Sequence, residues 1–284
     1  MNNSPSWHLS TLQHITEQLR PDLGVRALLV VGSVVYGSVD EWSDLDIVVV
    51  VADEQLARFF PTRAWLEQLG TVFAYEQFPG QERATTRVCF TDGRRIDAAI
   101  VTESSLAEEA NWPFALDVRV CFSRSPIVDG LLSKPNAPPL FHPATAEQFE
   151  TLVNQFWFKA VVAVNKVVRG DLLIALHLCL DVMEDACVLA MMLRDRATST
   201  TIHKTGGLGN EIVARLHAPG NPPSALSILD SLAGTGRLFD TLAGQWSPLY
   251  EERQQLFLIR VAQARTAITQ LETNRRHSLI KIER

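Results

Sequence analysis

The chain has 284 residues, of which 46% are hydrophobic and 20% charged, and its formal net charge is −6. This composition is that of a globular protein with room for one large or two modest domains. The negative charge argues against a nucleic-acid binder, which presents a basic surface, and it fits a cationic small substrate.

The N-terminal part predicts alternating helices and strands. Apolar residues Leu12, Ile15 and Leu19 recur at helical spacing, and Pro21 ends this first helix. Further segments follow in chain order: apolar strands at residues 25–31 and 47–52, a mixed, mainly helical stretch at 54–69, and a strand at 71–78.

A glycine- and serine-containing segment between the first two strands ends in two alternating aspartates. Asp44 and Asp46 project from one face of a strand, while Leu45 and Ile47 project from the other. Two carboxylates side by side repel each other unless a cation lies between them. Mg²⁺, which takes a few carboxylates together with substrate phosphate oxygens, meets that need.

Gly32 and Ser33, at the end of the first strand, predict a turn that binds phosphate. Glycine permits a backbone conformation that other residues resist, and exposed N–H groups with the Ser33 hydroxyl can hold phosphate oxygens. A phosphate site beside a metal site predicts a bound nucleoside triphosphate. A P-loop is excluded because no lysine follows Gly37. The structural alternative is an ordinary turn between two strands.

A β-hairpin is predicted over residues 87–101, since Asp92-Gly93 is a strong two-residue turn signal between two β-compatible runs. Asp97 interrupts the apolar second strand of this hairpin. A carboxylate in such surroundings is costly unless it is paired or bound to a metal. The alternative is an edge strand on which Asp97 faces water.

The motif formed by Gly32-Ser33, ten residues and Asp44-Leu45-Asp46 resembles the signature of the DNA polymerase β-like nucleotidyltransferase superfamily. Within it, the chain most resembles bacterial antibiotic adenylyltransferases, which modify aminoglycosides or lincosamides. The resemblance implies that Asp97 is a third acidic site residue, as a metal ligand or as a general base. It also implies two Mg²⁺ ions, ATP as co-substrate, and nucleotide binding by Gly32, Ser33 and Ser43.

The second half predicts a helical domain. After a short strand at 118–122, four prolines in residues 123–139 indicate a linker. Long helical patterns then cover 145–169, 171–194 and, with a break near 245–248, 226–274. We therefore expect an α+β protein with a nucleotidyltransferase domain (1–125), a linker (126–141) and a helical substrate-binding bundle (142–284), with the active site in the cleft between the two domains.

Charged residues on the first two long helices are further candidates. Lys159 and Lys166 share one helix face and either contact triphosphate and departing pyrophosphate or are solvated. Asp181 and Glu184 belong to an acidic ridge that either binds drug amines and helps to deprotonate the hydroxyl, or faces solvent. Trp112 either stacks on a sugar ring or base, or belongs to the core.

The four cysteines show no CxxC pairing and lie in apolar surroundings, which indicates free thiols in a reducing cytoplasm. The N-terminal residues lack the charged and apolar regions of a signal peptide, and no apolar run is long enough to span a bilayer. We expect a cytoplasmic protein without a membrane or nucleic-acid partner, either monomeric or homodimeric.

The function predicted from the resemblance is transfer of AMP from Mg·ATP to a hydroxyl of an aminoglycoside antibiotic, with release of pyrophosphate. Lincosamide adenylylation, protein AMPylation of the antitoxin type, and an inactive nucleotide-binding module are the alternatives. A nucleic-acid polymerising enzyme is disfavoured because the chain is acidic and has no basic, aromatic-studded groove.

Overall fold

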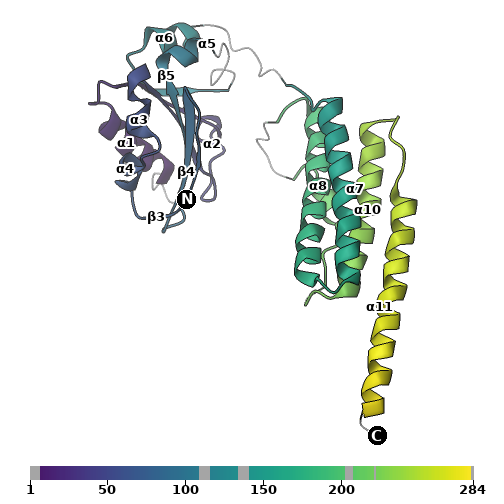
Figure 1. The fold of residues 1–284 in the computed structure, drawn as a ribbon. Helices are drawn as coiled ribbons and strands as arrows, with labels where there is room; N and C mark the ends of the chain where they lie inside the picture. Colours follow the sequence, from purple (N-terminus) through teal and green to yellow (C-terminus); the bar gives the residue numbers. More distant parts are fainter. Residues whose placement is uncertain (1–6, 109–115, 134–140, 202–206, 221, 283–284) are drawn as a thin grey trace. The chain divides into compact units, whose positions relative to one another are not determined.

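A computed structural model of the chain describes residues 7–108, 116–133, 141–201, 207–220 and 222–282 (Figure 1). The chain divides into two compact units, Met1–Leu140 and Phe141–Arg284, and each unit is described by itself. No helix in these described ranges combines the length and the apolarity that crossing a bilayer requires.

The first unit is built on a mixed sheet with the strand order β3-β4-β5-β2-β1-β6. The strands are β1 (Val25–Val31), β2 (Leu45–Val51), β3 (Val72–Phe78), β4 (Arg83–Phe90), β5 (Arg95–Thr102) and β6 (Arg119–Ser123). Only β2 and β5 pair in parallel; the other pairs are antiparallel. β4 and β5 form the predicted hairpin around Asp92-Gly93, but its connection is longer than the predicted two-residue turn, because the N–H of Phe90 bonds to the carbonyl of Arg94.

Helices cover the two faces of the sheet unequally. On one face α1 (Trp7–Leu19), α3 (Leu56–Phe59) and α4 (Ala64–Glu67) bury apolar side chains against strand residues such as Ile47 and Ile96. On the other face α5 (Glu103–Glu108) and α6 (Pro126–Leu132) pack over Val48, Val50 and Val101. That second apolar cluster ends before the start of β2, where Asp44 and Asp46 lie. The short helices η1 (Asp53–Gln55) and α2 (Ser33–Tyr36) complete the unit.

Helix α6 occupies the first part of the stretch that the sequence indicates as a linker. The Ser125 side chain accepts a hydrogen bond from the N–H of Val128, and Pro126 takes the first helical position, where its missing N–H costs nothing. Val128 and Leu131 are buried against the sheet. A proline-rich stretch therefore begins here with a packed helix, while residues 134–140 lie outside the described ranges.

The second unit is helical, as predicted. Its elements are α7 (Ala146–Val168), α8 (Leu172–Thr198), α9 (Asn210–Val213), α10 (Ala225–Trp246) and α11 (Gln254–Ile282). A capping box between Thr145 and Gln148 begins α7. The core contains Phe156 stacked on Phe239 with ring centroids 3.6 Å apart, together with Trp157. The α+β class predicted from the sequence is confirmed.

Asp240 connects α10 to the start of α11 and gives a test of this packing. Its carboxylate is 2% exposed and accepts hydrogen bonds from the Tyr250 hydroxyl at 2.6 Å and from the backbone N–H of Arg253 at 3.0 Å. Asp240→Ala leaves these partly buried donors without their acceptor. We expect the free energy of unfolding to fall by about 2–4 kcal/mol in urea denaturation.

The matched control is Asp230→Ala, on the same helix. Asp230 is exposed and pairs with Arg265, so its loss should change the free energy of unfolding by no more than about 0.5 kcal/mol. Equal effects of the two substitutions would contradict the role given to Asp240.

Candidate active site

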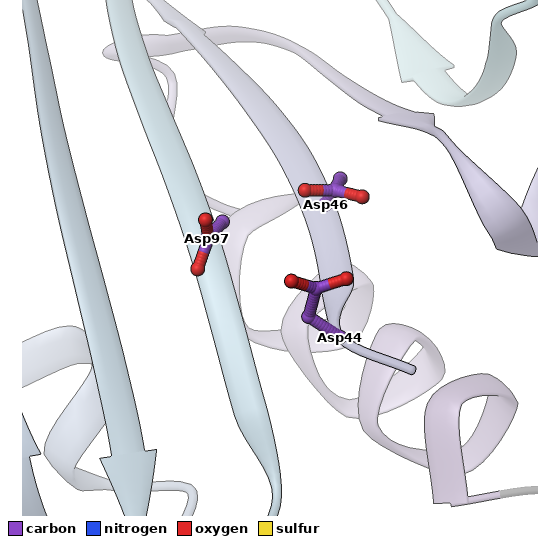
Figure 2. A group of neighbouring side chains, drawn as sticks. All are labelled: Asp44, Asp46 and Asp97. Atoms are coloured by element: carbon purple, nitrogen blue, oxygen red, sulfur yellow. The ribbon is translucent and has the colours of Figure 1, made fainter. Parts of the chain in front are cut away.

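Three carboxylates meet on the face of the sheet that also packs against α5 and α6, at the end of β2 where Asp44 and Asp46 lie. In the parallel pairing of β2 with β5, Asp46 lies beside Asp97, and Asp44 lies just before β2 on the same face. Each of the three offers an oxygen atom, and these atoms all lie within 4.8 Å of one another. Figure 2 shows the side chains of Asp44, Asp46 and Asp97 gathered in one group. The structure thus brings together the acidic residues that the sequence singled out.

Burial and mutual repulsion raise the pKa of two carboxyl groups of this cluster. Burial, followed by the charges of Asp44 and Asp97, raises the pKa of Asp46 to about 7. Burial also raises the pKa of Asp97, although the Arg87 guanidinium beside it acts in the opposite direction. A carboxyl group with a raised pKa is one whose ionised form lacks compensation. A bound cation supplies that compensation.

Gly32 is the residue that allows the first strand to approach Asp46. Its φ of +73° is in the left-handed region, and a Cβ atom at this position would lie 2.4 Å from Asp46 Oδ2. Ser33 follows as the first residue of α2, and its Oγ is buried with no hydrogen-bond partner among the described residues. The predicted glycine–serine turn therefore lies directly beside the acidic cluster.

The loop that leads into Asp44 is held by a residue that the sequence reading missed. His8 on α1 is fully buried and its Nε2 donates to the backbone carbonyl of Ser43 at 2.9 Å. The Ser43 hydroxyl donates to Asp40 Oδ1 at 2.8 Å. His8 lies four residues before Leu12 on the apolar stripe of α1, and a polar residue on such a stripe is the signal that could have identified it.

The remaining candidates, apart from Trp112, lie in the second unit. Lys159 pairs with Asp185 at 2.5 Å, and Lys166 pairs with Asp171 at 2.9 Å. Asp185 is buried, which raises its pKa. Asp181 and Glu184 lie on the same helix, with Asp181 3.8 Å from His177 and Glu184 exposed. Trp112 lies outside the described residues.

The fold and the site together define a class of enzyme. A mixed sheet with an aspartate pair on one strand, a third acid on the neighbouring parallel strand and a glycine–serine turn beside them is the arrangement of a nucleotidyltransferase. A profile of the streptomycin adenylyltransferase family matches residues 9–206, and the chain belongs to this family. It is therefore an enzyme that transfers AMP to a hydroxyl group of an antibiotic, and the resemblance described from the sequence is confirmed.

Solved structures with similar folds share little sequence with the chain. An aminoglycoside 6-adenyltransferase from Bacillus subtilis is 15% identical, with a TM-score of 0.41, 92% of this chain covered and 99% of that chain covered. A spectinomycin adenyltransferase from Enterococcus faecialis is 10% identical, with a TM-score of 0.33 and coverages of 92% and 98%. No curated protein matches the sequence.

The glycine turn generates a prediction with a matched control. Gly32→Ala places a methyl group against Asp46 Oδ2, whereas Gly37→Ala, at φ +69°, meets no atom within 4 Å. Both changes cost about 1–2 kcal/mol of stability because each forces a left-handed backbone on alanine. We expect only Gly32→Ala to reduce adenylyl transfer strongly, about tenfold or more, because it displaces a carboxylate of the site. Comparable activity of the two variants would show that Gly32 does not position Asp46.

The raised pKa of Asp46 predicts how pH changes stability in chelator-treated protein. Its pKa rises from 3.8 to about 7 on folding, so its protonated form is favoured in the folded state. The stability that this gives is fully present below about pH 4 and is lost as pH rises to 7. Asp46→Asn, which cannot ionise, should therefore gain thermal midpoint over the wild type progressively between pH 4 and 7. A difference in thermal midpoint between the variant and the wild type that does not change with pH would show that the pKa of Asp46 is not raised.

Proposed function

We propose that the first unit binds Mg·ATP over Asp44, Asp46 and Asp97, and that the enzyme transfers AMP to a hydroxyl of an aminoglycoside with release of pyrophosphate. One observation carries the proposal. Three carboxylates with oxygens within 4.8 Å of one another lie beside a glycine–serine turn, and the central one has its pKa raised to about 7.

The residues fit a hard divalent cation. All three ligands are oxygen donors, and two carboxylates on one strand with a third on the neighbouring strand leave further coordination positions for phosphate oxygens and water. The unfavourable ionisation of Asp46 without a cation is a second argument for this fit. When bound, the ion would polarise the α-phosphate and stabilise the charge on the departing pyrophosphate.

The chain's own residues have separate tasks in this proposal. Asp44 and Asp46 hold the ion, while Asp97 either completes the ion's ligands or takes the proton of the attacking hydroxyl. The raised pKa of Asp97 supports the second task, because a general base works best when its pKa approaches the working pH. Arg87 contacts Asp97 Oδ2 at 2.9 Å and fixes its orientation.

Nucleotide contacts are assigned to the turn and its surroundings. The Ser33 hydroxyl, buried and without a described partner, has a hydrogen bond to offer a phosphate oxygen after a rotation of its side chain. Ser43 is engaged with Asp40, so its contribution is to fix the loop before Asp44. Lys159 and Lys166 would neutralise phosphate only by leaving the aspartates that they contact.

Acceptor binding is assigned to the second unit. Asp181 and Glu184, one turn apart on α8, present carboxylates that suit the ammonium groups of an aminoglycoside. Trp112, in the chain of the first unit, is retained as a residue that stacks on a sugar ring or base. The net charge of −6 and the family description, which names an aminoglycoside, favour this class over lincosamides.

The experiment is pyrophosphate release from ATP with Mg²⁺ across a panel of aminoglycosides and lincosamides. We expect release with aminoglycosides, and a loss of at least about a hundredfold in Asp46→Asn because metal-dependent stabilisation is removed. The control is Asp22→Asn, a carboxylate that pairs with Arg58 at the opposite end of the sheet and should retain activity. Full activity of Asp46→Asn would refute the metal assignment, and release with lincosamides alone would refute the acceptor class.

A further inference from the structure

Two arginines contact the acidic cluster from its β4–β5 side. Arg95 Nη2 lies 2.7 Å from Asp44 Oδ2, and Arg87 Nε lies 2.9 Å from Asp97 Oδ2. Both side chains are about half exposed, at 52% and 51%. Together with Asp44 and Asp97 they line a cavity of about 560 Å³ in the first unit. Two of the three carboxylates in the cluster therefore have an arginine as a cationic neighbour.

The two arginines are held in different ways. Arg87 also contacts Glu76 Oε2 at 3.4 Å on β3 and covers the Phe78 ring at 5.1 Å from its centroid, so contacts on two neighbouring strands fix it. In the described part of the chain, Asp44 is the only ion-pair partner of Arg95. Arg95 is thus the arginine that can leave its carboxylate without breaking other contacts.

A divalent ion and Arg95 compete for the same carboxylate. Two positive groups a few ångströms apart repel each other, and Asp44 Oδ2 accepts a hydrogen bond from the Arg95 guanidinium. Resting on the proposed function, we propose that Arg95 is an exchangeable counter-ion of Asp44: its guanidinium would leave Asp44 when a divalent ion is held there, and it would then contact a phosphate oxygen of the triphosphate. Arginine suits this second contact because it stays charged and its planar fork matches phosphate.

Opposite effects on two affinities test the proposal. With calorimetry, we expect Arg95→Gln to bind Mg²⁺ alone about fivefold more tightly than the wild type, because the competitor is removed. With Mg²⁺ saturating, the same variant should bind an ATP analogue with a methylene bridge between the α- and β-phosphates about tenfold more weakly, because a phosphate contact is lost. A general loss of structure would weaken both affinities.

The matched control is Arg58→Gln, which removes another exposed arginine–aspartate pair, with Nη2 2.8 Å from Asp22 Oδ2, away from the cluster. Neither affinity should change in it. Mg²⁺ affinity that is unchanged or weaker in Arg95→Gln overturns the exchange, and unchanged or tighter analogue binding overturns the phosphate contact.

Asp46→Asn in the same titrations separates this proposal from the proposed function. If Asp46→Asn loses Mg²⁺ binding while Arg95→Gln behaves as the wild type, the exchange alone is wrong. If Asp46→Asn binds Mg²⁺ as the wild type does, the metal assignment is wrong. The proposed release of Arg95 from Asp44 is then wrong as well.

Discussion

Repulsion among Asp44, Asp46 and Asp97 is the constraint on which the site depends. The carboxylates cannot move apart, because the strands that carry them are fixed by burial on both sides of the sheet: Ile47 and Ile96 pack under α1, α3 and α4, while Val48 and Val50 pack under α5 and α6. The packing energy of the sheet thus maintains an electrostatic arrangement that is unfavourable by itself. Such an arrangement is preorganised for a cation.

Local signals explain how much the sequence could predict. Three signals each lie within a few residues of sequence: the alternation of Asp44 and Asp46, the Asp92-Gly93 turn and the isolated carboxylate of Asp97. They indicated the strands and the acidic cluster. The contact of Arg95 with Asp44 was not predicted, because it depends on the pairing of β2 with β5, which lie far apart in the chain, and the contact of Arg87 with Asp97 depends on the exact register of the β4–β5 hairpin. Helix α6 was missed for a related reason: Pro126 signals a loop and a first helical position equally well.

In the second unit, the spacing of charged residues in the sequence does not reveal which ion pairs they form. Lys159 and Lys166 share a helix face, as predicted, but each contacts an aspartate, and Asp185 is buried by its pairing with Lys159. A lysine that leaves a partly buried pair strands the carboxylate of its partner, so it cannot reach a phosphate at no cost. Sequence spacing gives the face on which a residue lies, and the structure gives the contact that a functional role must replace.

The three carboxylates of the first unit differ in how much positive charge lies beside them. Arg95 contacts Asp44 and Arg87 contacts Asp97, whereas Asp46, among the described residues, has no arginine in direct contact and its pKa rises to about 7. Two guanidinium groups therefore leave the deficit of positive charge at the residue beside Gly32. A proton can fill this deficit at low pH, and a cation held by these carboxylates would fill it at neutral pH.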